Sequence, residues 1–114
     1  MRYFEDMVIG QTESYGAYAV TREEVIAFAG KYDPQPFHLD DAAAAATYFG
    51  RISASGFHTA SMMMAMMVQH WQEGDAIASL GSPGLDELRW IKPVYPGDLL
   101  RVESTLLEKR RSQN

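Results

Sequence analysis

The distribution of hydrophobic and polar residues is most unusual over residues 57–73. Within this stretch, residues 60–68 hold five of the seven methionines of the chain and leave almost no polar face over two helical turns. A helix of this kind has to be covered on most sides, and at ~1.5 Å per residue it is about 25 Å long, so we expect it to run through the core. The methionines could also form a pliable lining for an acyl chain, but core filling is the simpler interpretation for most of them.

Three further segments have the composition of strands. Residues 12–20 mix aromatic and β-branched side chains with small ones. Residues 85–91 and 99–107 are separated by a connection that contains two prolines and a glycine, and the second of them alternates apolar and polar positions as a half-buried strand does. Residues 76–80 have the composition to begin another strand.

Two helix starts can be recognised from their capping residues. Thr21 and Glu24 have the spacing of a capping box, with Thr21 as N-cap and Glu24 three positions later, and the apolar residues that follow predict a helix that stops at Gly30. Asp40 is placed to cap a short alanine-rich helix over residues 41–48.

A carboxylate and an imidazole lie close together between these two helices, in the segment Asp33-Pro-Gln-Pro-Phe-His38. The two prolines fix their own φ angles and keep the preceding residues extended, so the segment cannot coil into a helix. A carboxylate and a neutral imidazole can jointly hold one water molecule and move its protons, as a hydratase or hydrolase requires. On spacing alone, an Asp-Pro turn followed by a His bonded to the backbone is the more common arrangement.

Composition sets the limits of this interpretation. The 114 residues are 46% hydrophobic and 22% charged, which predicts one globular domain over residues 1–114. The formal net charge of −5 argues against nucleic acid or an anionic membrane as a partner, and no stretch has the length and apolarity of a membrane span. There is no cysteine, and the three histidines lack metal-ligand spacing, so no metal is expected. A cytoplasmic protein is the default expectation.

Three segments, taken in order, carry a family resemblance: residues 33–38, the run Gly-Arg-Ile-Ser-Ala-Ser-Gly at 50–56, and Arg-Trp-Ile-Lys-Pro-Val-Tyr-Pro-Gly-Asp at 89–98. Together with Phe-Glu-Asp at 4–6 and Ile-Gly at 9–10, they make the chain resemble the MaoC-like dehydratases, the R-specific enoyl-CoA hydratase group of the hot-dog fold. The resemblance covers essentially the whole chain. It implies an α+β fold in which an antiparallel sheet wraps around a long central helix.

The resemblance also implies a function. Members of the family interconvert an enoyl thioester and a 3-hydroxyacyl thioester of CoA or acyl carrier protein, without a cofactor. By position, Asp33 and His38 correspond to the pair that holds the water, and Gly56 supplies the backbone N–H that faces the thioester carbonyl. Gln35 stands where the family usually has Asn. A hot-dog thioesterase and a non-catalytic acyl-thioester-binding protein are the alternatives.

Several more residues are candidates for substrate contact, each with a simpler explanation beside it. Ser55 replaces a frequent His, His58 could be a polar residue satisfied at a helix start, and His70 is better explained as a cap or core hydrogen-bonder. The expected substrate-binding residues are Ser55, Phe57, His58, Tyr95 and Pro96, and turn geometry alone is the simpler explanation for the last two. The cations that could meet a phosphate are Arg51, Arg89 and Lys92.

The end of the sequence departs from the family, whose members usually continue with two more strands. Residues 108–114 resemble the interior of a connecting loop. We therefore expect a C-terminally incomplete hot-dog domain, or one in which a partner supplies the missing cover, because the sheet edge and the methionine-rich helix would otherwise be open. Hot-dog proteins generally pair through their sheets, which implies a homodimer or higher homo-oligomer here.

Overall fold

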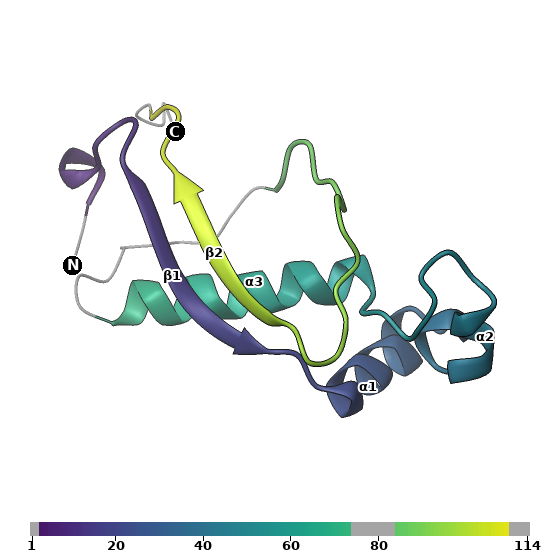
Figure 1. The fold of residues 1–114 in the computed structure, drawn as a ribbon. Coiled ribbons are helices and arrows are strands. Elements are labelled where there is room, and N and C mark those ends of the chain that lie inside the picture. Colours follow the sequence, from purple (N-terminus) through teal and green to yellow (C-terminus); the bar gives the residue numbers. More distant parts are fainter. Residues whose placement is uncertain (1–2, 74–83, 110–114) are drawn as a thin grey trace.

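The computed structural model describes residues 3–73 and 84–109. In this part of the chain two antiparallel strands lie across one face of a long helix, and two shorter helices gather at one end of it (Figure 1). The elements are the 3₁₀ turns η1 (Phe4–Asp6) and η2 (Pro36–His38), the strands β1 (Thr12–Ala19) and β2 (Leu99–Thr105), and the helices α1 (Arg22–Tyr32), α2 (Asp41–Ala45) and α3 (Gly56–Gln72).

The sheet is bent around α3 by an irregularity in β1. The pairing of β1 with β2 shifts register between Tyr15 and Tyr18, and Gly16 lies in this interval with φ +84°. A bulge of this kind bends the strand that carries it. A side chain at Gly16 would meet Met66 of α3, so the missing Cβ lets the strand approach the helix closely. Beside it, Tyr15, Met66 and Val102 form one buried cluster.

A second buried cluster joins the helical end of the molecule to α3. It connects the end of β1, both short helices, the segment that precedes α3 and the second turn of α3 itself. Its buried members are Val20, Val25, Ala44, Ile52, Ala54 and Met62. This cluster fixes the elements that carry the candidate site.

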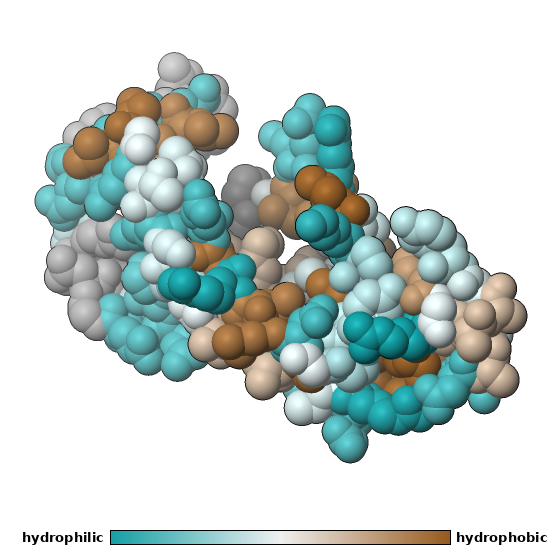
Figure 2. Space-filling model, in the orientation of Figure 1, coloured by the Kyte–Doolittle hydropathy of each residue, from teal (hydrophilic) through white to brown (hydrophobic). Residues whose placement is uncertain are grey.

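The expectation that α3 is covered on most sides is wrong for the described part of the chain. Only His58, Met62 and Met66 of the helix are buried, whereas Phe57 is 66% and Met64 43% exposed. The reason is that β1 and β2 cover one face of α3, as Figure 1 shows. The radius of gyration is 16.9 Å, larger than the ~13 Å typical of a compact domain of this length. Hydrophobic patches accordingly remain on the surface (Figure 2).

The helix starts are confirmed, and both of the shorter helices end elsewhere than predicted. Thr21 accepts a hydrogen bond from the N–H of Glu24 at 3.3 Å, and Asp40 accepts one from Ala43 at 2.8 Å. The first helix runs through Gly30 to Tyr32, because a glycine weakens a helix by only about 1 kcal/mol, whereas Pro34 forces Asp33 out of helical geometry.

The second helix ends at Ala45 instead of residue 48. The hydroxyl of Thr47 donates to the carbonyl of Ala44 at 2.7 Å and accepts from the N–H of Phe49 at 3.2 Å. These bonds give the backbone an alternative to a further helical turn, as Ser and Thr side chains often do.

Two of the predicted strands are confirmed and one is wrong. Residues 12–20 and 99–107 correspond to β1 and β2, and the alternation in the latter gives a buried Val102 between exposed neighbours. Residues 85–91 form no strand; the chain bends there, with Glu87 at φ +52°. Residues 76–80 lie outside the described residues.

Within residues 3–73 and 84–109, no helix combines the length and apolarity needed to cross a membrane.

Replacing Gly16 with Ala tests how closely β1 must approach α3. A Cβ there would lie 2.7 Å from Sδ and 3.2 Å from Cβ of Met66, so rotating the end of the methionine does not remove the overlap. Gly10 is the matched control, because it has a similar φ of +86° with nothing within 4 Å. We expect Gly10→Ala to lower the free energy of unfolding by about 1 kcal/mol and Gly16→Ala by about 1–3 kcal/mol more, measured by urea unfolding at one protein concentration. Equal losses would show that the overlap is relieved.

Candidate active site

Asp33 and His38 meet because the chain turns back on itself between α1 and α2. Asp33 is the C-cap of α1, and the two prolines that follow lead directly into η2, whose last residue is His38. The turn is closed by a backbone hydrogen bond from the N–H of His38 to the carbonyl of Gln35 at 2.9 Å. The result is a separation of 3.4 Å between Oδ2 of Asp33 and Nε2 of His38.

The orientation of the His38 ring is set from its other side. Nδ1 lies 2.6 Å from the carbonyl oxygen of Ser53, and the residue is only 5% exposed. Because a carbonyl can only accept, Nδ1 must carry the hydrogen. In the neutral imidazole Nε2 then carries a lone pair and no hydrogen, and it faces the carboxylate of Asp33.

Asp33 is held by two donors from different parts of the chain. Nε2 of Gln35 donates to Oδ1 at 2.7 Å, and the hydroxyl of Ser55 donates to Oδ2 at 2.8 Å. The hydrogen bond from Gln35 is the largest cause of a pKa of Asp33 below its ordinary value; the bond from Ser55 acts in the same direction, as does His38 when its ring is protonated, and partial burial opposes them. The carboxylate is therefore ionised at neutral pH.

The start of α3 forms the opposite wall of the site. Ser55 is fully buried and stands at the N-cap, but its hydroxyl goes to Asp33 and makes no capping bond. The first N–H groups of a helix, beginning with that of Gly56, have no acceptor within the helix, and the helix dipole adds partial positive charge there. A side chain at Gly56 would overlap the indole of Trp90, so the glycine allows that ring to lie against the helix start.

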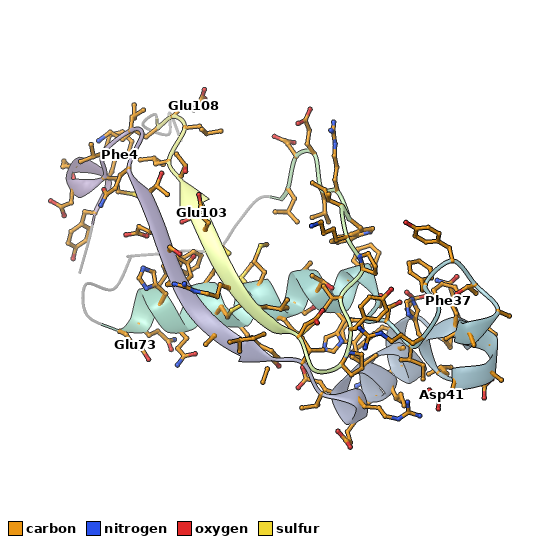
Figure 3. All side chains as sticks on the ribbon, in the orientation of Figure 1. Phe4, Phe37, Asp41, Glu73, Glu103 and Glu108 are labelled. Atoms are coloured by element: carbon orange, nitrogen blue, oxygen red, sulfur yellow. The ribbon has the colours of Figure 1, made fainter. Side chains whose placement is uncertain are left out.

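These groups open onto a cavity of about 640 Å³. Its walls include two pairs of aromatic rings: Phe37 and Phe49 stack with ring centroids 5.4 Å apart, and Phe57 meets Trp90 edge to face at 5.9 Å. Figure 3 shows Phe37 at the end of the molecule built by α1 and α2. Among the described residues no methionine lines the cavity, so the structure gives the α3 methionines no acyl-lining role there; of the five, Met62 and Met66 are buried core residues.

The structure brings five of the expected residues to this cavity. They are Asp33, His38, Ser55, Gly56 and Phe57. Of the three cations expected to meet a phosphate, Arg89 and Lys92 line the cavity, whereas Arg51 lies over the ring of Tyr95 at 3.9 Å.

The other three expected residues do not line the cavity. Tyr95 donates its hydroxyl to the carbonyl of Phe49 at 2.8 Å, and its own N–H donates to Asp98, so with Pro96 it belongs to the turn that leads into β2. His58 is buried between α1 and α3, with Nε2 2.9 Å from Glu24. Turn geometry therefore describes the positions of Tyr95 and Pro96. His58 lies near the helix start as a polar residue that is only half satisfied, because Nδ1 has no partner among the described residues.

Sequence reasoning missed three contributors to the site. Ser53 acts through its backbone carbonyl, which no side-chain pattern could signal. Phe49 and Trp90 come from segments without regular structure, so periodicity gave no indication that they line the same cavity. The described residues hold no group of three or more side chains able to bind a metal ion, and His70 stacks on Tyr15 at 3.8 Å, away from the cavity.

Comparison with known proteins identifies the class. The sequence profile of the MaoC-like domain matches residues 6–114, and the chain belongs to this family. It is 31% identical over 108 residues to the 3-hydroxybutyryl-CoA dehydratase of Methylorubrum extorquens, a match that covers 93% of this chain and 64% of that protein.

Solved structures confirm the hot-dog fold. A MaoC-like dehydratase from Rhodospirillum rubrum superposes with a TM-score of 0.80 at 35% identity, over 99% of this chain and 75% of that one. The (R)-hydratase of A. caviae, described as involved in PHA biosynthesis, gives a TM-score of 0.70 at 30% identity, over 93% and 76%. The chain is therefore a member of a hydratase and dehydratase family.

The two donors to Asp33 can be tested separately. We expect Gln35→Ala and Ser55→Ala each to raise the pKa of Asp33 toward its ordinary value, because each removes a hydrogen bond to the ionised form. The measurement is a titration followed by NMR of the ¹³C-labelled Asp carboxyl groups, with Asp33→Asn to assign the signal. An unchanged pKa of Asp33 in both variants would contradict the described geometry.

Proposed function

We propose that this protein is a hydratase or dehydratase that interconverts an enoyl thioester and a 3-hydroxyacyl thioester. The observation that supports the proposal best is the convergence of two acceptors, Oδ2 of Asp33 and Nε2 of His38, at 3.4 Å on the wall of an aromatic cavity. Two neighbouring acceptors suit one water molecule, which can donate one hydrogen to each of them.

In the hydration direction, the pair orients a water molecule and removes one of its protons as the oxygen attacks the β carbon of the enoyl group. A proton is delivered to the α carbon, and the carbon–carbon double bond is lost. Dehydration follows the same path in reverse. The two groups form one coupled unit in this proposal, so the proton is assigned to the pair.

The backbone N–H of Gly56 is proposed to face the thioester carbonyl. Negative charge develops on that oxygen as water adds, and a fixed donor at a helix N-terminus stabilises it through the hydrogen bond and the helix dipole. Losing one such donor typically costs about 3 kcal/mol of transition-state stabilisation.

The cavity suggests how the substrate lies. The aromatic wall that includes Phe37 and Phe57 is suited to an acyl chain, and Arg89 and Lys92 are suited to the phosphates of CoA or of an acyl carrier protein. Ser55 acts on the substrate indirectly in this proposal, through the orientation of Asp33. The name of the Methylorubrum relative supports CoA as one carrier.

Two other functions make different products. A thioesterase would direct water to the thioester carbonyl and release a free thiol from a saturated acyl-CoA. A non-catalytic acyl-binding protein would bind the thioester without consuming the alkene. A panel of enoyl-CoAs of different chain lengths, followed by loss of the conjugated double bond and by free thiol release, separates the three.

Asp33→Asn and His38→Gln test the proposed pair. Each keeps the approximate size of the side chain but replaces a group that can take a proton from water with an amide that cannot, so we expect hydration of a short enoyl-CoA to fall by about 10²–10⁴-fold. Circular dichroism should show an intact fold. His70→Gln is the control, since His70 lies outside the cavity, and it should keep the wild-type rate. Wild-type turnover in either Asp33→Asn or His38→Gln would contradict the assignment of these two residues as the water-activating pair.

A homodimer is also part of the proposal. The exposed face of α3 and the large radius of gyration support it, because apolar surface of this kind favours association. Sedimentation velocity at micromolar concentration should give twice the 12.8 kDa of one chain. A species of 12.8 kDa with the wild-type hydration rate would contradict it.

A further inference from the structure

Helix α1 meets the start of α3 through side-chain contacts near both of its ends. At its C-terminal end, Asp33 accepts the hydrogen bond from Ser55 that orients the carboxylate. In its first turn, Glu24 lies 2.9 Å from Nε2 of His58. Asp33 follows Glu24 by nine positions, which corresponds to about 13 Å along the helix axis. Their partners lie only three residues apart, so α1 crosses the start of α3.

His58 makes the contact at the far end of α1 from the cavity. His58 is 3% exposed and stacks on Phe28 of α1, with ring centroids 4.7 Å apart and planes 9° from parallel. Because an ionised carboxylate only accepts, Nε2 of His58 donates to Oε1 of Glu24. The same oxygen accepts from the hydroxyl of Tyr18 at 2.5 Å, which ties β1 into the contact.

The other ring nitrogen of His58 argues against a purely stabilising role. Nδ1 is buried and has no hydrogen-bond partner among the described residues. A buried polar atom left without a partner typically costs about 1–3 kcal/mol, so an apolar ring would fill this space at a lower cost. What the imidazole adds over such a ring is the directed hydrogen bond to Glu24.

We propose that His58 is a positioning residue: its hydrogen bond to Glu24 fixes the angle at which α1 crosses α3, and this angle lets Asp33 reach both Ser55 and His38. A helix held at one point can pivot, whereas a helix held at two points cannot. Without the bond, α1 remains packed through Val25 in the core and tied to β1 through Glu24 and Tyr18, but it loses the directed contact that sets its angle to α3. The catalytic part of this inference rests on the proposed hydratase function; the geometric part does not.

The charged and titratable groups around His58 are few. In the depression that His58 shares with α1 and β1, they are Tyr18, Glu24, Lys31 and Tyr32. The pKa of Glu24 lies below its ordinary value, first because of the hydrogen bond from Tyr18 and then because of the one from His58. Glu24 is therefore ionised at neutral pH, as the proposed contact requires.

Two substitutions at His58 separate its contributions. His58→Phe keeps a ring against Phe28 but removes the donor, and His58→Gln keeps an N–H near the position of Nε2 but loses the ring. Glu24→Ala removes the acceptor from a partly exposed position and serves if His58→Phe does not fold. His70→Phe is the matched control, because His70 also lies on α3, pairs with a carboxylate (Glu13, 3.4 Å) and stacks on an aromatic ring.

The first readout is the titration of Asp33, followed by NMR of ¹³C-labelled Asp carboxyl groups, which needs no activity. We expect His58→Phe and Glu24→Ala to raise the pKa of Asp33 toward its ordinary value, because both loosen the Ser55 contact, and His58→Gln to restore the low pKa. His70→Phe should leave it unchanged. If folded His58→Phe and Glu24→Ala titrate at Asp33 as His70→Phe does, the positioning role is wrong.

The second readout is the pH dependence of hydration. The same two variants should lower kcat by about tenfold or more, since a misplacement of about 1 Å can cost a hundredfold, while KM stays within about twofold. The acidic limb of the rate profile should move to higher pH with the pKa of Asp33. Equal losses of kcat in His58→Phe and His70→Phe would overturn the inference. Absence of hydration in the wild type would instead refute the proposed function, and the Asp33 titration would still decide the role of His58.

Discussion

The hydrogen bond from Ser55 to Asp33 is the contact on which the candidate site depends. It joins Asp33, the C-cap of α1, to Ser55, the residue immediately before α3, and the two lie 22 residues apart in the sequence. Ser55 makes this bond instead of the usual capping bond, so the first N–H groups of α3 lack the side-chain acceptor that an N-cap residue usually supplies. One buried hydroxyl thereby connects the carboxylate proposed to bind water with the helix end proposed to bind the thioester.

The remaining geometry follows from local constraints on the two sides of this bond. The prolines at 34 and 36 stop α1 and lead into a single 3₁₀ turn, which places His38 one short loop away from Asp33. The carbonyl of Ser53 then selects the tautomer whose lone pair faces the carboxylate. Neither acceptor is held by a flexible surface side chain alone, so the pair is preorganised before any substrate arrives.

Much of this arrangement could be predicted from the sequence, because it rests on local chemistry. The cap at Thr21, the alternation along β2 and the apolar run of α3 each depend on neighbouring residues, and each element is found where it was expected. Asp33 and His38 could be singled out from the prolines between them, but their spacing alone favoured a turn with a backbone-bonded His, and only the family resemblance indicated the pair. The fold and family expected from the three motif segments are confirmed by the comparisons.

The predictions were wrong where the structure depends on contacts between residues that lie far apart in the sequence. The placement of His58 depends on Glu24 and Phe28, which lie about 30 residues away, and nothing in the motif around Gly56 signals them. Residues 85–91 have strand composition, but they pair with no strand among the described residues, and composition alone cannot supply a partner. The expectation that α3 is covered on most sides was wrong for a similar reason. An apolar sequence shows that a helix needs packing partners, but it does not show which segments provide them.

The position of the new oxygen atom after reaction in H₂¹⁸O tests the central claim most directly. A short enoyl-CoA would be incubated with the protein, and the label located by mass spectrometry in the products of the wild type and of Asp33→Asn. The account predicts one ¹⁸O in the 3-hydroxyl group of an intact thioester, lost in the variant. Label in a free carboxylate with release of CoA thiol, or no incorporation by the wild type, would contradict it.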